Sequence, residues 1–398
     1  MIDLLSCKVM PYAWGSRTAI AGLRGLGASA GPEAELWMGA HPLGPSKVNR
    51  GGRERSLTDL VAEDPAREMG HRARDAFGAR LPFLLKVLAA AQPLSLQAHP
   101  TEAQARAGYA DEENRGVPLD APNRNYKDPC HKPELICALT PFDALCGFRR
   151  VEDTLRLFDE LGVRELAAVL TPLRRSPDQT GLAETFRAIM TTPQAARAAM
   201  VDATVAACLR PGGTGFERER AWAVKLAGLY PGDVGVVSAL LLNLVHLSPG
   251  EAIFMGAGNL HAYLEGVGIE IMASSDNVLR GGLTPKHVDV PELMNVLDFT
   301  YGPMTPVRPR EVDAVENVYD APVREFRLST LRMAGAPSMR ETLGPEILLC
   351  TEGSLHVGAE GKTSLEIKKG DSVFVSGSAR HYTVQGDGLL YRATTNLA

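Results

Sequence analysis

The spacing of hydrophobic and polar positions divides the chain into four regions. Residues 1–150 mix short apolar runs with Pro and Gly, which predicts strands and turns with a few short helices. Residues 151–235 have an Ala-rich, helix-favouring composition, and apolar side chains recur at helical spacing in their first segment: Leu155, Leu157, Phe158, Leu161 and Val163. A strand-like hydrophobic pattern returns over residues 236–310. From residue 311 onwards the pattern predicts a series of consecutive strands.

The strand pattern is clearest near the C-terminus. Six short apolar runs separated by Gly-rich turns are typical of an antiparallel sandwich or barrel: EILLCTEG, SLHVGAEG, KTSLEIKKGD, SVFVSGSA, RHYTVQGDG and LLYRATT. Residues 367–384 of this region resemble residues 247–266, because each segment has a turn ending in Gly and an acid, an apolar strand, small residues and a His. We interpret the two segments as diverged copies of one β-unit, and their Gly–acid turn resembles that of cupin jelly rolls.

These patterns predict a mainly β protein with a helical domain, built from two cupin-like jelly-roll β units plus an α-helical insertion. A length of 398 residues agrees with two to three domains at about 150 residues each. We expect residues 1–150 and 236–310 to form one cupin-like domain and residues 151–235 the helical insertion domain. Residues 311–398 are expected to form a C-terminal cupin-like β domain.

Composition narrows the class of partner. Forty-two Lys and Arg against 47 Asp and Glu give a net charge of −5, so no global basic field predicts binding to nucleic acid or an anionic membrane. Six cysteines without a C-x-x-C pair indicate a reducing compartment. The N-terminus lacks the pattern of a secretory signal, and the longest apolar stretch, residues 81–96, is too interrupted to span a bilayer. We expect a soluble cytoplasmic protein with no obligate protein partner.

Three further segments resemble binding motifs, but we interpret each as an ordinary structural element. GKTS at 361–364 lacks the first Gly of a phosphate-binding loop, since position 356 is His, and a strand is predicted after it instead of a helix. GLRGLGASAG at 22–31 is Gly-rich but does not follow a clear strand, so we expect a loop. HRARDAFGAR at 71–80 is a basic patch on a predicted helix, which we interpret as a solvated face.

A candidate metal site draws on three separate segments. Gln97 and His99 are two residues apart in LSLQAHP, so an extended strand places them on the same face. Glu134 follows Pro133, which favours an extended edge. His261 lies between a Gly-rich turn and a strand, the usual place for a ligand at a barrel mouth. Together they would supply nitrogen and oxygen ligands with room for water or substrate, as a catalytic zinc site requires.

Each of these residues also has an ordinary interpretation. A single His on an apolar strand is more often a hydrogen-bonded core residue, Gln97 could be polar surface, and Glu134 could pair with Lys132. Cys130 beside His131 could be proposed as a ligand, but no second cysteine has suitable spacing. The spacing alone therefore leaves both the metal site and buried polar residues open.

Longer motifs resemble a known family. They run in order from YAWGS to the segment before residue 293 and are similar to those of the type I mannose-6-phosphate isomerases: YAWGS (12–16), ELWMGAHP (35–42), LPFLLKVL (81–88), QPLSLQAHP (92–100), NYKDPCHKPEL (125–135), HAYLEG (261–266) and SSDNVLRGGLTPKHVDVPEL (274–293). The helical insertion and the C-terminal strands agree with the family's domain plan in their hydrophobic pattern and composition, although they contain no family motif. One departure is Asn259-Leu260 before HAY, where many members place a proline, and we expect it to change loop stiffness more than chemistry.

The resemblance implies a site as well as a fold. It implies one zinc ion per chain, held by the four residues already collected, which are Gln97, His99, Glu134 and His261. It implies an essential arginine at Arg280. The family's other pocket residues correspond to Trp14, Lys86, Ser95, Lys132, Tyr263, Glu270, Asp276 and Lys286.

The implied activity is the interconversion of D-mannose 6-phosphate and D-fructose 6-phosphate, a small sugar-phosphate substrate. Moving a proton between C1 and C2 creates an enediolate, which zinc as a Lewis acid and Arg280 can stabilise. Arg280 could equally bind the phosphate, as could Ser95, Lys86 and Lys132, whereas Trp14 and Tyr263 could pack against the sugar. The proton carrier stays open among four candidates: Glu270, Asp276, Lys86 and Lys132.

Two alternatives compete with this hypothesis. One is a cupin-fold sugar-phosphate sensor that has lost catalysis, against which the intact ligand set and Arg280 argue. The other is an iron-dependent cupin oxygenase, which a Gln ligand and the absence of a two-His facial triad in one motif disfavour. No ligand set surrounds His381, so we expect the C-terminal unit to bind no metal and to serve packing or pocket closure.

Overall fold

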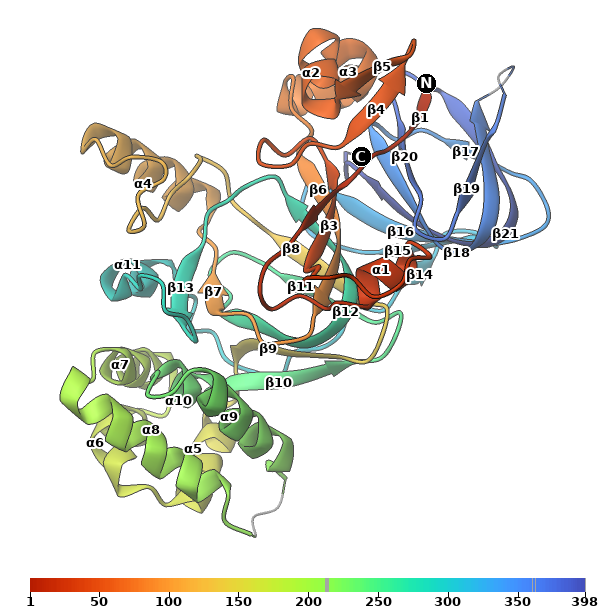
Figure 1. Ribbon diagram of the computed structural model, residues 1–398. Helices are drawn as coiled ribbons and strands as arrows, with labels where there is room; N and C mark the ends of the chain where they lie inside the picture. Colours follow the sequence, from red (N-terminus) through yellow and green to blue (C-terminus); the bar gives the residue numbers. More distant parts are fainter. Residues whose placement is uncertain (212–214, 360, 362, 398) are drawn as a thin grey trace.

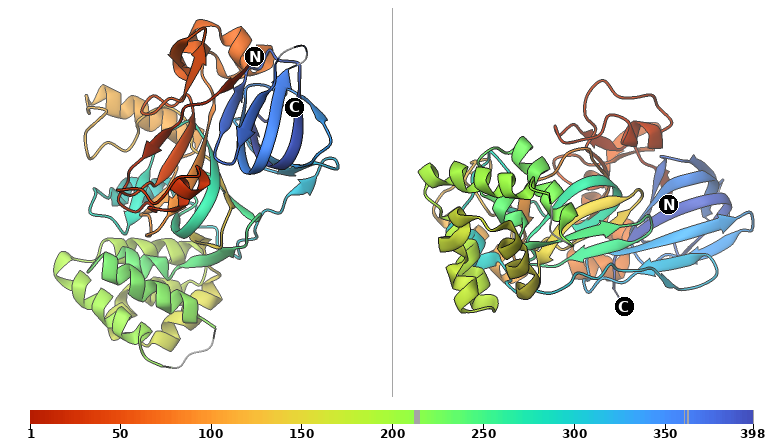
Figure 2. Two further views of the ribbon diagram at one scale, coloured as in Figure 1. Left: turned by 45° about the vertical axis from the view of Figure 1, so that its right-hand side comes forward. Right: turned by 90° about the horizontal axis from the view of Figure 1, so that it is seen from below.

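The computed structural model describes residues 1–211, 215–359, 361 and 363–397. Figure 1 shows a central β unit, a body of helices at one end and a second β unit at the other end, with both chain termini beside the second β unit. The views in Figure 2 keep this order. The prediction of a mainly β protein with a helical part is confirmed.

The central β unit is a ten-stranded sheet. Its strands are β2 (Lys8–Met10), β3 (Glu35–Gly39), β6 (Phe83–Ala90), β7 (Leu96–Ala98), β8 (Glu134–Ala138), β9 (Phe142–Phe148), β10 (Leu242–Leu247), β11 (Ala252–Met255), β12 (His261–Ala273) and β13 (Leu279–Gly282). The main path is β10-β9-β12-β6-β3-β2, and β12 also pairs with β7 and β8. One 13-residue strand therefore joins segments that lie far apart in the sequence.

The first 150 residues and the segment before the second sheet add a hairpin and several helices. These elements are α1 (Ala19–Leu23), β4 (Lys47–Arg50), β5 (Arg53–Ser56), α2 (Leu57–Glu63), α3 (Pro65–Phe77), α4 (Glu102–Asn114) and α11 (Val290–Val296). The helix predicted for residues 71–80 is confirmed by α3, which ends at Phe77. The loop expected from residue 22 begins later, since α1 continues to Leu23.

The helical body follows β9. It contains α5 (Val151–Leu161), the short 3-10 helix η1 (Arg164–Leu166), α6 (Ala167–Arg175), α7 (Gln179–Met190), α8 (Gln194–Cys208), α9 (Glu217–Leu229) and α10 (Gly235–Ala239). Helix α5 ends at Leu161 and is capped by Gly162, whose left-handed backbone favours glycine. Val163, which the pattern placed at helical spacing, therefore lies outside this helix. The last helix runs past the predicted boundary at residue 235, because α10 ends at Ala239. No helix of the described ranges is long and apolar enough to cross a membrane.

This body is a true insertion in the sheet. The strands on its two sides, β9 and β10, are antiparallel neighbours, with Phe142 opposite Leu247. Its start and end are therefore held together by sheet hydrogen bonds. Its core is continuous with that of the sheet, since buried Phe186 and Leu226 belong to the same apolar cluster as Leu96 and Leu264.

The second β unit is a nine-stranded sheet. Its strands are β1 (Ile2–Leu4), β14 (Arg310–Glu311), β15 (Glu316–Tyr319), β16 (Arg327–Ala334), β17 (Ser338–Glu341), β18 (Glu346–Ala359), β19 (Leu365–Lys368), β20 (Ser372–Val375) and β21 (His381–Thr394). The six predicted C-terminal strands are wrong in number. Gly353 and Gly386 adopt positive φ inside β18 and β21 instead of ending them, so two pairs of predicted strands merge.

The GKTS motif includes residue 362, which lies outside the described residues, and the strand predicted after it is β19. The assignment of residues 1–150 to the central unit is wrong at its start, because β1 pairs with β20 of the second sheet. The two β units also share one apolar core, in which Leu85 and Ile269 cluster with Ile347 and Phe374.

Two buried ionic networks support this architecture. In the first, which links the units, Arg50 of β4 contacts Asp3 over 2.7 Å and Glu68 over 2.6 Å, and the Ser376 hydroxyl donates to Glu68 over 2.7 Å. The second network lies inside the second β unit and contains Arg392, Glu346, Glu316 and Tyr382. Its centre is Arg392, which is 2.6 Å from Glu346 and 3.3 Å from Glu316, and the Tyr382 hydroxyl donates to Glu346 over 2.7 Å.

Candidate functional site

A buried triad of His99, Glu134 and His261 lies where three strands begin or end. His99 follows β7, whereas Glu134 and His261 are the first residues of β8 and β12. His99 Nε2 is 3.4 Å from Glu134 Oε1, and His261 Nε2 is 3.4 Å from Glu134 Oε2. These ligand-type atoms lie within 4.8 Å of one another, so the triad could hold a metal ion.

The hydrogen bonds of the two imidazoles fix which nitrogen faces the triad. His99 Nδ1 is 2.7 Å from the carbonyl of Asn277, and His261 Nδ1 is 3.0 Å from the carbonyl of Asn259. A carbonyl only accepts, so each Nδ1 carries the proton and each Nε2 presents a lone pair.

Three triad atoms are buried without a hydrogen-bond partner among the described residues: His99 Nε2, His261 Nε2 and Glu134 Oε2. Burial lowers the pKa of His99 to about 4, so its imidazole is neutral at neutral pH. Although burial acts against it, Lys132 and His99 hold the pKa of Glu134 well below its usual range. Two imidazoles and one carboxylate with unsatisfied atoms fit a divalent metal such as zinc.

Gln97 extends this group along β7. It lies opposite His261 of β12 and opposite Arg280 of β13 in the sheet register. Gln97 thus connects the buried triad with an open cavity that it lines.

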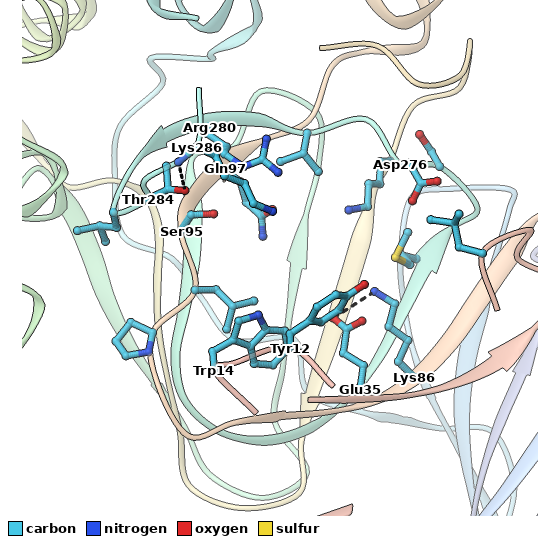
Figure 3. A pocket seen from close by; sticks show the side chains of 18 of the residues that line it. Tyr12, Trp14, Glu35, Lys86, Ser95, Gln97, Asp276, Arg280, Thr284 and Lys286 are labelled. Atoms are coloured by element: carbon cyan, nitrogen blue, oxygen red, sulfur yellow. Dashed lines mark hydrogen bonds and ion pairs between the residues drawn. The ribbon is translucent and has the colours of Figure 1, made fainter. Parts of the chain in front are cut away.

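That cavity, which we call the front cavity, has a volume of about 390 Å³. Eight residues singled out from the sequence line it, and Figure 3 labels all of them except Lys132: Trp14, Lys86, Ser95, Gln97, Lys132, Asp276, Arg280 and Lys286. They come from β6, β7, β13 and the loops beside them. The structure therefore gathers side chains that are separated by more than two hundred residues.

Four cationic side chains line the front cavity, and they differ in whether a carboxylate lies within ion-pair distance. Lys86 Nζ is 2.8 Å from Glu270 and Lys132 Nζ is 3.0 Å from Glu134, so both ammonium groups have carboxylate partners. Arg280 and Lys286 have no carboxylate within 4.0 Å in the part of the chain that the structure describes. Burial, with Arg280 nearby, lowers the pKa of Lys286. Two neighbouring cations without an acid partner favour an anionic ligand.

The segment that carries these two cations has a special backbone. Leu283 is buried and has φ of +54°, in the left-handed region that a bulky side chain rarely adopts. Asp233 of the helical body accepts hydrogen bonds from the N–H of Gly235 over 2.7 Å and from the N–H of Thr284 over 3.0 Å. A Cβ on Gly282 would lie 2.7 Å from Gly235 Cα. The helical body therefore braces the segment between Arg280 and Lys286.

Known proteins are similar in sequence to this chain over nearly its whole length. The family model of the type I phosphomannose isomerase catalytic domain matches residues 2–151. The mannose-6-phosphate isomerase of Escherichia coli (strain K12) is 38% identical over 393 residues, which cover 98% of each protein. The chain belongs to the mannose-6-phosphate isomerase family. The resemblance predicted from the sequence motifs is confirmed.

Solved isomerase structures agree as closely. A mutant phosphomannose isomerase from Salmonella typhimurium has a TM-score of 0.93 and 36% identity, with 100% of each chain covered. A mannose 6-phosphate isomerase in its holo, zinc-bound form has a TM-score of 0.92, also with 36% identity and full coverage. This family member therefore has the same fold as an isomerase whose structure is described as zinc-bound.

Two predicted pocket residues do not line the front cavity of this isomerase. Tyr263 and Glu270 of β12 are buried, and the Tyr263 hydroxyl donates to Glu270 over 3.0 Å. The structure thus places Tyr263 behind the cavity wall, and its packing against the sugar stays a prediction. Burial raises the pKa of Glu270, although Lys86 opposes the shift.

Several lining residues were missed from the sequence: Tyr12, Glu35, Trp37 and His41. Tyr12 stacks with Trp14 at a ring separation of 5.8 Å, and His41 is 3.3 Å from Asp276. Although burial acts to raise it, His41 lowers the pKa of Asp276. All four belong to the motifs YAWGS and ELWMGAHP, which were recognised as family motifs, but no spacing rule separates them from core residues.

Proposed function

We propose that this chain is a zinc-dependent aldose–ketose isomerase that interconverts D-mannose 6-phosphate and D-fructose 6-phosphate through an enediolate. The observation that carries the proposal is the buried triad with three unsatisfied ligand atoms beside a cavity that contains two unpaired cations. Membership of the isomerase family and the zinc-bound relative support it.

We propose that Gln97, His99, Glu134 and His261 hold one zinc ion per chain. When bound, zinc supplies Lewis-acid stabilisation of negative charge on oxygen. The imidazole protons point away from the site to the backbone carbonyls of Asn277 and Asn259, which fixes both rings for binding.

The phosphate end is proposed to lie at Arg280 and Lys286. Figure 3 places these side chains with Ser95 and Thr284 on one side of the front cavity, away from Lys86 and Glu35. A guanidinium, an ammonium and two hydroxyls offer many donors to a phosphate dianion. This arrangement favours phosphate binding over enediolate stabilisation as the role of Arg280.

We propose Glu270 as the proton carrier between C1 and C2. Among the four candidates, Asp276 has a lowered pKa beside His41, and the pKa of Lys86 is raised because Glu270 and Glu35 outweigh its burial. Glu270 has a raised pKa, which suits a group that must accept and return a proton. Glu270 does not line the front cavity, so we propose that its proton reaches the sugar through Lys86, which lies 2.8 Å from Glu270 and does line the cavity.

Two further assignments belong with this proposal. We propose that both β units are cupin-like jelly rolls, with the zinc in the central unit. We also propose a cytoplasmic enzyme, since all six cysteines are free thiols and a reducing compartment preserves them.

A coupled assay tests the function. Purified protein should convert mannose 6-phosphate, lose activity in chelator and regain it with zinc. Binding of the sugar phosphate without turnover, at full zinc content, would identify a sensor instead. In deuterated water, an enediolate predicts deuterium at C1 or C2 of the product, whereas complete retention of protium would contradict an exchanging intermediate.

A further inference from the structure

A second cavity, which we call the rear cavity, has a volume of about 670 Å³. It lies between the end of α3, the first turns of α4, residues 129–131 and residues 322–325. Its lining includes the C-terminal part of the basic segment 71–80. Neither the proposed reaction nor the front cavity uses these side chains.

Three guanidinium groups line the rear cavity: Arg80, Arg106 and Arg324. Arg106 forms an ion pair with Glu102. Arg80 and Arg324 have no carboxylate within 4.0 Å anywhere in the described ranges. Arg80 contacts the Cys130 thiol over 3.2 Å, and the Arg324 guanidinium lies 6.0 Å from the centre of the Phe77 ring.

Two carboxylates also line the cavity, and both already have cationic partners. Glu102 pairs with Arg106, and Glu325 is 3.0 Å from His131. The hydrogen bond with Glu325 raises the pKa of His131. The rear cavity therefore has an excess of positive charge that its own acids do not cancel.

Apolar side chains also line the cavity, among them Phe77, Pro82, Pro322 and Val323. Guanidinium groups bind phosphate through paired N–H donors, and a cavity of this size holds a drug-sized ligand. We propose that the rear cavity binds a phosphate monoester that carries an apolar or aromatic ring, with Arg80 and Arg324 on the phosphate.

The two cavities share walls. Residues 129–131 line the rear cavity and Lys132 lines the front cavity; likewise Ala273 and Ser274 face the rear, and Ser275 and Asp276 face the front. Adjacent residues of the same two segments thus line different cavities. A ligand that moves either segment moves Lys132 or Asp276 with it.

A hydrogen-bond path leads from the rear cavity to the triad. The side chain of Asn277 donates to the carbonyl of Cys130 over 2.8 Å, and the carbonyl of Asn277 accepts from His99 over 2.7 Å. Occupation of the rear cavity is therefore expected to change kcat at the front cavity. This second step rests on the proposed isomerase activity, whereas ligand binding does not.

Binding is tested by titration calorimetry of the zinc-loaded protein with phenyl phosphate. The Arg280→Ala background removes the competing phosphate site, and one phenyl phosphate per chain should still bind. Adding Arg80→Ala and Arg324→Ala should weaken this binding at least tenfold. Arg72→Ala, which removes one positive charge from an exposed residue of α3 outside the cavity, should leave it within twofold.

Two binding results would overturn the proposal: no binding in the Arg280→Ala background, or binding that the paired arginine substitutions leave unchanged. Inorganic phosphate should bind at least fivefold more weakly than phenyl phosphate, because it leaves the apolar wall uncovered. Equal affinity would refute the ring-binding part of the site.

The coupling is tested with the active enzyme and mannose 6-phosphate. A compound that competes only at the front cavity raises KM and leaves kcat unchanged. Phenyl phosphate should change kcat at least twofold in the wild type and in Arg72→Ala, but not in the Arg80→Ala, Arg324→Ala variant. A purely competitive pattern in all three would refute the coupling, while the calorimetry would still report on the site.

Discussion

The Asp233 carboxylate accepts a hydrogen bond from the backbone N–H of Thr284 over 3.0 Å, and so joins the helical body to the segment that carries Arg280 and Lys286. The same carboxylate accepts from Gly235 over 2.7 Å. The helical body is therefore a support for the proposed phosphate site and not only an addition to the sheet.

Asp233→Asn should weaken substrate binding more than chemistry. An amide oxygen accepts one of the two hydrogen bonds, and its NH₂ group cannot accept the other. We expect KM to rise roughly tenfold with kcat nearly unchanged, which corresponds to about 1.4 kcal/mol. Asp178→Asn is the matched control, because that N-cap carboxylate accepts from Thr180 and Gly181 within the helical body. An equal rise in KM for both variants would contradict the bracing role.

Arg280→Ala should reduce the preference for phosphorylated substrate. Removing the guanidinium leaves the phosphate dianion with fewer donors, so kcat/KM for mannose 6-phosphate should fall by about 10²–10³ while zinc content stays at one per chain. Any turnover of free mannose, which offers no phosphate to Arg280, should change less than tenfold. If the two substrates lose activity equally, Arg280 stabilises the enediolate instead.

Glu270→Gln should abolish most proton transfer. The amide preserves the size of the side chain but cannot accept a proton, so kcat should fall by about 10²–10⁴ with zinc retained. Glu265→Gln on the same strand is the control, because Glu265 is exposed and pairs with Lys225 over 2.5 Å. Turnover near the wild-type rate in Glu270→Gln would assign the proton to another group.

Removing a ligand should remove the metal. His261→Ala deletes one of the three unsatisfied atoms of the triad, so zinc affinity should fall by more than about 100-fold, beyond the loss known for outer-shell groups. His246→Ala changes an exposed histidine of the same sheet that pairs with Asp143, and should keep its zinc. Metal analysis after dialysis separates the two; equal zinc in both variants would show that the triad is not the site.

The Arg50 network should make stability depend on acid pH. Although burial acts to raise it, Arg50 and Ser376 lower the pKa of Glu68. The unfolded state therefore binds a proton first as the pH falls, and the stabilisation is present above the unfolded value of 4.5 and lost below it.

Glu68→Gln tests this linkage by denaturant unfolding. It should cost about 1–3 kcal/mol at pH 7, because Arg50 loses a buried partner. The difference from the wild type should shrink as the pH falls below about 4, since the wild-type carboxyl is then protonated too. A difference that stays constant down to pH 3 would contradict the role of the Glu68 charge.

The sequence allowed the fold class, the helical insertion and the triad residues to be predicted, because each has a local signal. Helical spacing marks α5, and His99, Glu134 and His261 begin or end recognisable strands. Family motifs then added Arg280 and Lys286, whose shared place at the front cavity no spacing rule could reveal.

Other features depend on contacts that no local pattern records. The pairing of Ile2 with Val375 joins positions at opposite ends of the chain. Gly353 reads as a turn residue, yet neighbouring strands hold its positive φ inside β18. Glu35 lies in an apolar strand, and only the fold shows that it faces the front cavity beside Lys86.

The Arg392 network has a consequence for when the metal enters. In the second β unit, the guanidinium of Arg392 neutralises the buried carboxylates of Glu316 and Glu346. The apolar core of this unit is continuous with that of the central unit. We therefore expect the chain to complete its folding before zinc binds the triad. The zinc supply would then determine which fraction of the folded protein is active, without changing the amount of folded protein in the cell.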